Sequence, residues 1–251
     1  MKETVYMSNC KPQFHGTFSN DKLGGKSQKI MAVSYVPGKD LVYFGDGRPV
    51  SDCKGTCSSV DCSQCGKRNV CYAIDSYVQY PAVTVNRVEN TMQLRSDMDQ
   101  HFEDIKQAII KNKIEILRYT ESGEIESFKH FMKLVQLAND MPDVLVYAYT
   151  KNYEVLRTYF NSGHELPKNL VMLISVWGSQ GVKEYEEFKH HENIKCFAVK
   201  SDIKVDAMCP AYRKDENGKV KRVHSDAVKC GNCGLCTGKH PTVKVIGCVE
   251  H

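Results

Sequence analysis

The chain has 251 residues, of which 41% are hydrophobic and 25% are charged, an ordinary composition for a globular protein with a full core. Its net charge of +4 is too small to indicate nucleic-acid binding by itself. No apolar run approaches membrane-spanning length, and the N-terminal residues contain no apolar signal segment. We therefore expect a cytoplasmic protein without membrane contact.

Strands and helices are predicted to alternate along most of the chain. Short apolar runs predict strands at 29–36, 41–44, 114–119, 144–149, 170–176 and 194–199. Apolar residues at helical spacing predict helices at 85–113, 125–137, 153–160 and 182–190. This alternation predicts an α/β fold with a parallel sheet covered by helices, either an open sheet or a full or partial (β/α) barrel. In each arrangement, functional residues gather where the strands end.

The alternation stops after Asp202, and we therefore expect two parts. These are an α/β domain over residues 1–202 and a cysteine-rich lobe over residues 203–251. The lobe contains a charged, hairpin-like turn around Asn217 and Gly218. Because the lobe has few apolar residues, we expect it to need a bound metal in order to fold.

A dense run of cysteines follows the first predicted strands. Its members are Cys53, Cys57, Cys62, Cys65 and Cys71, separated mainly by small and polar residues. Thiolates are soft ligands, and such a loop is typical of a zinc site or an iron–sulfur cluster. Three thiolates suffice for a cluster that keeps one iron open for a small molecule, and four thiolates close the cluster. Five cysteines exceed either number, so either one cysteine is spare or the loop has two roles. In a chain without a signal segment, cysteines this close are metal ligands more often than disulfides.

A second cysteine set lies near the end of the sequence. Cys230, Cys233 and Cys236 follow one another at Cys-x2-Cys spacing, and Cys209 stands before a proline. A Cys-x2-Cys-x2-Cys run with a remote Cys-Pro is typical of ferredoxin-type ligation of a four-iron cluster. Zinc sites more often use two separated Cys-x2-Cys pairs. We therefore favour an iron–sulfur cluster at this set and keep zinc as the alternative.

The order of several motifs resembles the phage and prophage "gene product 88" proteins of bacteria, over residues 29–251. The motifs are Gly55-Thr56-Cys57, Cys71-Tyr72-Ala73, Tyr80-Pro81, Asn90, Arg118, Ser122-Gly123-Glu124-Ile125, Tyr149-Thr150-Lys151, Leu166-Pro167-Lys168-Asn169-Leu170 and the run from Cys230 to Cys236. The family is itself poorly characterised, so this resemblance implies kinship and no particular activity.

The chain also resembles radical S-adenosylmethionine (SAM) enzymes, which are partial (β/α) barrels with a cluster loop after the first strand. In those enzymes a Gly-Glu motif at the end of the second strand holds the amino group of SAM, and Ser122-Gly123-Glu124 occupies that place. The resemblance implies one or two iron–sulfur clusters and a SAM site. There Glu124 would meet the ammonium, and Arg118 or Lys151 would meet a carboxylate or phosphate.

The cysteine spacing departs from the usual radical-SAM pattern. Those enzymes carry Cys-x3-Cys-x2-Cys, whereas here four residues separate Cys57 from Cys62. A competing interpretation also exists for Glu124, which would then be a solvated charge on a helix surface.

Two functions from different classes fit these features. The first is an iron–sulfur enzyme of radical-SAM type that acts on a nucleotide, a nucleic acid or another small substrate. The second is a non-catalytic protein in which clusters or zinc staple the loops and basic residues contact nucleic acid or protein. The basic residues concerned are Lys219, Lys221, Arg222 and Lys229.

Overall fold

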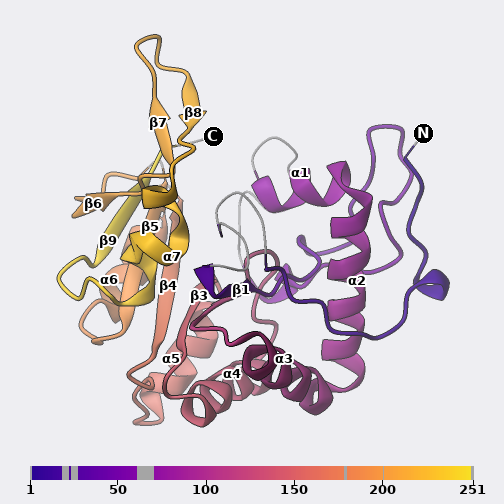
Figure 1. The fold of residues 1–251 in the computed structure, drawn as a ribbon, viewed down its shortest axis with the longest axis horizontal. Coiled ribbons are helices and arrows are strands. Elements are labelled where there is room, and N and C mark those ends of the chain that lie inside the picture. The colour runs from indigo at the N-terminus through magenta and orange to yellow at the C-terminus, as the bar shows by residue number, and fades with distance from the viewer. Residues whose placement is uncertain are drawn as a thin grey trace.

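A seven-stranded sheet forms the centre of the molecule (Figure 1). The structure is a computed structural model, and it describes residues 2–18, 23, 28–60, 71–177, 180–199 and 201–249. The strands of the sheet are β1 (Ile30–Ala32), β2 (Ile116–Tyr119), β3 (Leu145–Thr150), β4 (Leu170–Trp177), β5 (Ile194–Val199), β6 (Ala207–Met208) and β9 (Val245–Cys248).

All neighbouring strands of this sheet run parallel, in the order β1-β2-β3-β4-β5-β9-β6. The predicted α/β fold with a parallel sheet is therefore confirmed. Within the described residues no pairing joins β1 to β6, so the sheet is open and no closed barrel forms. The first five strands lie side by side in chain order, as is common for strands that follow one another in a chain.

Helices connect the strands and pack on the sheet. They are α1 (Tyr72–Gln79), α2 (Pro81–Ser96), α3 (Met98–Asn112), α4 (Phe128–Asp140), α5 (Tyr153–Asn161), α6 (Gln180–Phe188) and the short α7 (Cys230–Cys233). None of the described helices is long and apolar enough to span a bilayer.

Two predictions of local structure were wrong. The helix predicted at 85–113 is two helices, because Asp97 leaves the helical conformation and its side chain caps α3 by accepting a hydrogen bond from the amide of Gln100. The strand predicted at 41–44 is reduced to an isolated bridge between Tyr43 and Pro49, since the turn between them leaves no room for a ladder.

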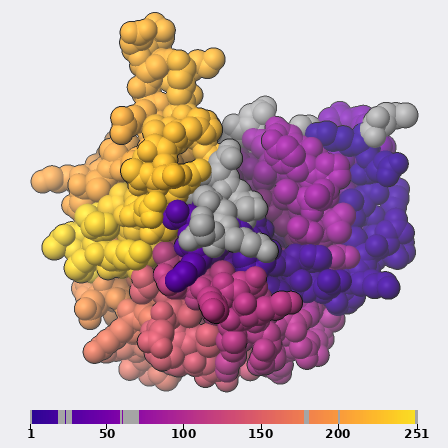
Figure 2. Space-filling model, viewed as in Figure 1, coloured from indigo at the N-terminus to yellow at the C-terminus, as the bar shows by residue number. Residues whose placement is uncertain are grey.

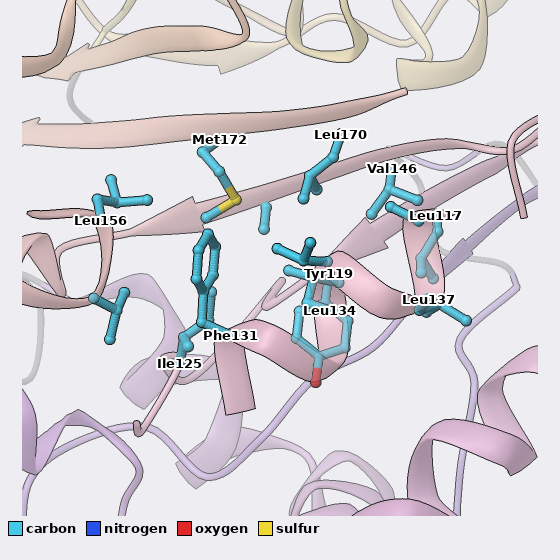
Figure 3. Close-up of a cluster of buried hydrophobic side chains, with 14 of the residues drawn as sticks. Leu117, Tyr119, Ile125, Phe131, Leu134, Leu137, Val146, Leu156, Leu170 and Met172 are labelled. Carbon is cyan, nitrogen blue, oxygen red and sulfur yellow. The ribbon is translucent and has the colours of Figure 1, made fainter. Parts of the chain in front are cut away.

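The main core lies between one face of the sheet and the helices α3, α4, α5 and α6 (Figure 3). Alternate residues of each strand enter it, so Leu117 and Tyr119 of β2 pack with Phe131 and Leu134 of α4. The other residues of each strand, such as Ile116 of β2, belong to the opposite face.

The opposite face of the sheet is covered by the second cysteine segment, residues 209–243. Its residues Cys230, Leu235 and Cys236 pack against Val171 and Leu173 of β4. Strands on both sides of the predicted boundary at residue 202 share the same sheet, because β9 inserts between β5 and β6. A separate two-stranded sheet, β7 (Tyr212–Lys214) with β8 (Val220–Arg222), forms the predicted hairpin.

Candidate functional site

A cavity of about 240 Å³ lies at the carboxyl ends of the parallel strands. Its wall includes the following residues singled out by the sequence: Cys57, Cys71, Arg118, Ser122, Gly123, Glu124, Lys151, Cys209, Cys230, Cys233 and Cys236. Tyr149, Trp177 and Phe197 add aromatic surface to the same wall. Parallel strands end at one edge, and this places residues from most of the chain around one space.

The remaining predicted metal ligands are not part of this wall as described. Cys53 is buried, only 3% exposed, in a separate cluster with Val36, Ile74 and Tyr77. Cys62 and Cys65 lie outside the described residues. Of the first cysteine set, the structure therefore brings Cys57 and Cys71 to the cavity and leaves Cys53 away from it.

Thr56 joins the first cysteine segment to the end of β2. Its hydroxyl donates to the carbonyl of Val36 at 3.0 Å and accepts from the amide of Glu124 at 2.8 Å. Gly123 makes this approach possible because its φ is +82° and a Cβ there would lie 2.6 Å from Thr56 Oγ1. The cysteine next to Thr56 and the carboxylate of Glu124 are thereby held on the same side of the sheet.

Glu124 is 5% exposed and lies in the loop before α4, which begins at Phe128. The interpretation as a solvated charge on a helix surface is therefore wrong. One carboxylate oxygen accepts from the Ile125 amide and the Thr150 hydroxyl, and the other accepts from the Lys151 amide. Burial raises the pKa of Glu124, and these hydrogen bonds oppose the rise. Within the described residues, these three donors fill three of the roughly four acceptor positions of a carboxylate.

Arg118 is the buried cation of the cavity wall. Its Nη1 lies 3.3 Å from a carboxylate oxygen of Glu121, and its guanidinium carbon lies 5.3 Å from the ring centre of Tyr149. Burial works against its charge, but Glu121 and the nearby tyrosines keep the pKa of Arg118 above its ordinary value. Its Nε is buried and has no hydrogen-bond partner within the described residues, which is unusual for a buried donor.

A buried chain of hydrogen bonds lies beneath the first cysteine segment. The Tyr35 hydroxyl lies 2.8 Å from His101 Nε2 and 2.5 Å from the Tyr119 hydroxyl, which lies 2.6 Å from His130 Nε2. The Glu126 amide donates to His130 Nδ1, so His130 is neutral and donates through Nε2. Burial lowers the pKa of His101 to about 4 and that of His130 to about 3.

The second cysteine segment is fixed by a buried charge. Lys195 of β5 is 2% exposed, and its ammonium donates to the carbonyls of Leu235 at 2.8 Å and His240 at 2.9 Å. These two carbonyls flank Cys236, whose sulfur accepts a hydrogen bond from the Tyr149 hydroxyl at 3.2 Å. The chain turns sharply after α7 because Gly234 adopts a φ of +66°.

The donor set of the second segment suits a thiolate-bound metal, since four cysteine thiols line one cavity. Burial raises the pKa of Cys236 to about 12 and also raises that of Cys233, so these thiols are protonated until a metal displaces the protons. Within the described residues, no three side chains of His, Cys, Asp or Glu stand close enough to share one ion. The thiols would therefore have to turn toward one another to hold a metal or a cluster.

Several residues of the site were given no role from the sequence. Thr56 and Tyr149 entered only as parts of the family motifs. Phe197 was visible only as a member of a predicted strand, where period-two spacing is the signal for the residues that share a face. Lys195 was the one charged residue of the apolar run 194–199, which is a signal for a buried partner.

Comparisons with known proteins give the family. The family model described as "Gene product 88" matches residues 14–239, and the chain belongs to this family. The motif order in the sequence had predicted the same family. No curated protein and no solved structure matches the chain.

Proposed function

We propose that this member of the gene product 88 family is an iron–sulfur enzyme of radical-SAM type that binds a small molecule in the cavity. The observation that carries the proposal is the composition of one cavity wall. Two cysteine sets distant in sequence, a buried carboxylate and a buried guanidinium all line it. Such a convergence of soft ligands and opposite charges is typical of a functional site rather than of a core.

The metal would be held by the cysteines of the cavity wall. Cys209, Cys230, Cys233 and Cys236 form a four-thiol donor set, which is the number that a four-iron cluster or a zinc ion requires. Cys57 and Cys71 are available for a second group. A bound cluster would supply one-electron transfer, and Tyr149 would donate its hydrogen bond to the sulfur of Cys236.

The charged side chains would orient the small molecule. Glu124 offers its remaining acceptor position to an ammonium, while Arg118 Nε and Lys151 suit a carboxylate or a phosphate. Tyr149, Trp177 and Phe197 would exclude water around the apolar part of the ligand. SAM carries an ammonium, a carboxylate and an apolar portion, and it is the ligand that we propose first.

A second candidate is a non-catalytic protein stapled by a metal. The observation that favours it is the packing of the second cysteine segment, whose Cys209, Cys230, Leu235 and Cys236 pack on one face of the sheet as a structural element would. In that case zinc is the expected metal at Cys209, Cys230, Cys233 and Cys236, and the cavity binds no SAM.

The metal is tested by anaerobic purification followed by iron, sulfide and zinc analysis and by the absorption band at roughly 400 nm. We expect Cys230→Ala/Cys233→Ala to lose at least half of the iron, and Cys57→Ala/Cys71→Ala to lose any remainder. Cys53→Ala and Cys196→Ala are the matched controls, since neither thiol lines the cavity. Colourless protein with zinc in place of iron would overturn the enzyme proposal in favour of the second candidate.

The ligand is tested by calorimetry of SAM with the reconstituted protein. We expect Glu124→Gln to weaken SAM binding at least tenfold, because the amide nitrogen cannot accept from an ammonium. Thr150→Val removes one hydrogen bond to Glu124 but keeps the carboxylate, so it should bind SAM nearly as the wild type does. Wild-type protein that contains a cluster but binds no SAM would refute the radical-SAM type and leave another kind of iron–sulfur protein.

A further inference from the structure

The β7–β8 hairpin, residues 212–222, projects from the body of the molecule (Figure 2). Its two strands pair only with each other, in a sheet of their own. The turn is fixed locally: the Asp215 carboxylate accepts from the amides of Asn217 and Lys219, and Gly218 adopts a φ of +75°. The hairpin is therefore a preformed ribbon with solvent on most of its surface.

Most of the net charge of the protein is placed on this ribbon. Its basic residues are Arg213, Lys214, Lys219, Lys221 and Arg222, and its acidic residues are Asp215 and Glu216, which leaves a net charge of +3 out of +4 for the whole chain. Arg213, Lys214 and Lys219 are exposed, and within the described residues they form no ion pair. The modest net charge of the chain thus conceals a strongly basic arm.

Basic side chains lie on both faces of the ribbon. Arg213 and Lys221 are directly opposite across the two strands and share one face, while Lys214 and Arg222 belong to the other. Two like charges directly opposite destabilise a hairpin. The ion pair of Lys221 with Asp215, at 2.9 Å, relieves only part of this repulsion. An anionic partner on the face of Arg213 and Lys221 would relieve the rest, and the other face also carries positive charge, from Lys214 and Arg222.

We propose that the β7–β8 hairpin is a nucleic-acid-binding arm that enters a groove of a duplex. The major groove of DNA admits a two-stranded β-ribbon, and phosphates flank that groove on both sides. A ribbon that is basic on both faces matches this arrangement, whereas a flat acidic protein surface would engage one face only. The arm binds through the phosphates, so its affinity depends strongly on salt.

The base of the arm also adjoins the cavity. Ala211, at the base of β7, lines the cavity and accepts a hydrogen bond from the Val223 amide, so both ends of the hairpin are fixed beside it. Val228, a few residues after β8, lines the same wall. A duplex on the arm therefore lies next to the cavity. The docking of nucleic acid on the arm is independent of the proposed function. Only the step in which the cavity acts on that nucleic acid rests on the proposed function.

The test is fluorescence anisotropy of a short labelled DNA duplex with the full chain, titrated at several salt concentrations. We compare Arg213→Gln/Lys214→Gln/Lys219→Gln with a control, Lys111→Gln/Lys129→Gln/Lys183→Gln, which removes three exposed charges from helices. The arm variant should bind at least tenfold more weakly, and its slope of log affinity against log salt should fall by about 3. The control should lose less than twofold.

Three results would overturn the proposal. They are no binding of duplex by the wild type at low salt, equal losses in the two triple variants, or equally tight binding of polyglutamate. The last result would indicate a general anion-binding surface or an acidic protein partner. Iron content is measured on the same samples, so a failed cluster and a failed arm are distinguished.

Discussion

The two cysteine-bearing segments line one cavity, but different interactions hold them there. The first, around Cys57, is fixed by close backbone packing: Gly123 lets Thr56 approach, and the Cys57 amide donates to the Gly38 carbonyl at 2.8 Å. The second, residues 209–243, is fixed near Cys236 by the buried ammonium of Lys195 and by apolar contact with the sheet face. The first segment should therefore be displaced by substitutions that enlarge a packed residue, and the second by removal of the Lys195 charge.

Acid should have the largest effect, and it acts beneath the first segment. His101 and His130 have pKa values of about 4 and about 3 in the folded protein, below the ordinary value of 6.5. The unfolded chain therefore takes up protons first, and stability that is complete above about pH 6.5 is lost as the pH falls toward 3. We expect a loss of about 3 kcal/mol or more for each histidine, measured by denaturant unfolding.

Two variants check the source of this pH dependence. His130→Gln should flatten the pH dependence of the unfolding free energy, because one of the two depressed groups is gone. His164→Gln changes an exposed histidine and should leave the dependence as in the wild type. The interpretation is contradicted if both variants behave alike.

Gly123→Ala should have the next largest effect, because the new methyl group would lie 2.6 Å from Thr56 Oγ1 and 2.8 Å from Tyr35 Cβ. The steric overlap and the left-handed backbone conformation together should lower the free energy of unfolding by about 3–5 kcal/mol. Gly163→Ala is the control: its φ is +78° but its Cβ would meet nothing within 4 Å, so only about 1–2 kcal/mol should be lost. Thermal unfolding of both variants measures the difference.

Lys195→Met should release the second segment and leave the first in place. Two partly buried carbonyls lose their donor, which should lower the free energy of unfolding by about 2–3 kcal/mol. Hydrogen exchange should accelerate across residues 230–240 and remain unchanged around Cys57. Lys244→Met, which removes a cation bonded to the exposed Glu192 carbonyl, serves as the control and should change neither region. Equal acceleration in both segments would mean that they are not held independently.

Cys196→Ala should have the smallest effect, because this thiol belongs to neither segment. Cys196 is fully buried in β5, and burial raises its pKa to about 12. We expect about 1 kcal/mol of lost stability and unchanged metal content. Alkylation followed by mass spectrometry should find Cys196 unmodified in the folded protein. Rapid alkylation would show that β5 opens more readily than its place in the sheet suggests.

The sequence predicted the strands β2 to β5 and the meeting of Glu124 with Lys151, because apolar runs alternated with helical spacing and parallel strands end at one edge. It did not predict that the two cysteine sets share a cavity. That meeting depends on contacts of residues 230–236 with Tyr149 and Lys195, which no local pattern indicates. β9 was missed as well, because its four residues Val245–Cys248 form a short run that contains a glycine. The division of 85–113 at Asp97 was missed because a capping aspartate looks like any polar residue on a helix surface.

The position of β9 also imposes an order on synthesis. As the chain leaves the ribosome, β1 to β5 can assemble one after another, each beside the strand made before it. β6 appears next but has no neighbour until the last strand emerges and fills the gap beside β5. β6 therefore joins the sheet only through β9, and the edge of the sheet beside β5 stays open until Val245–Cys248 are in place.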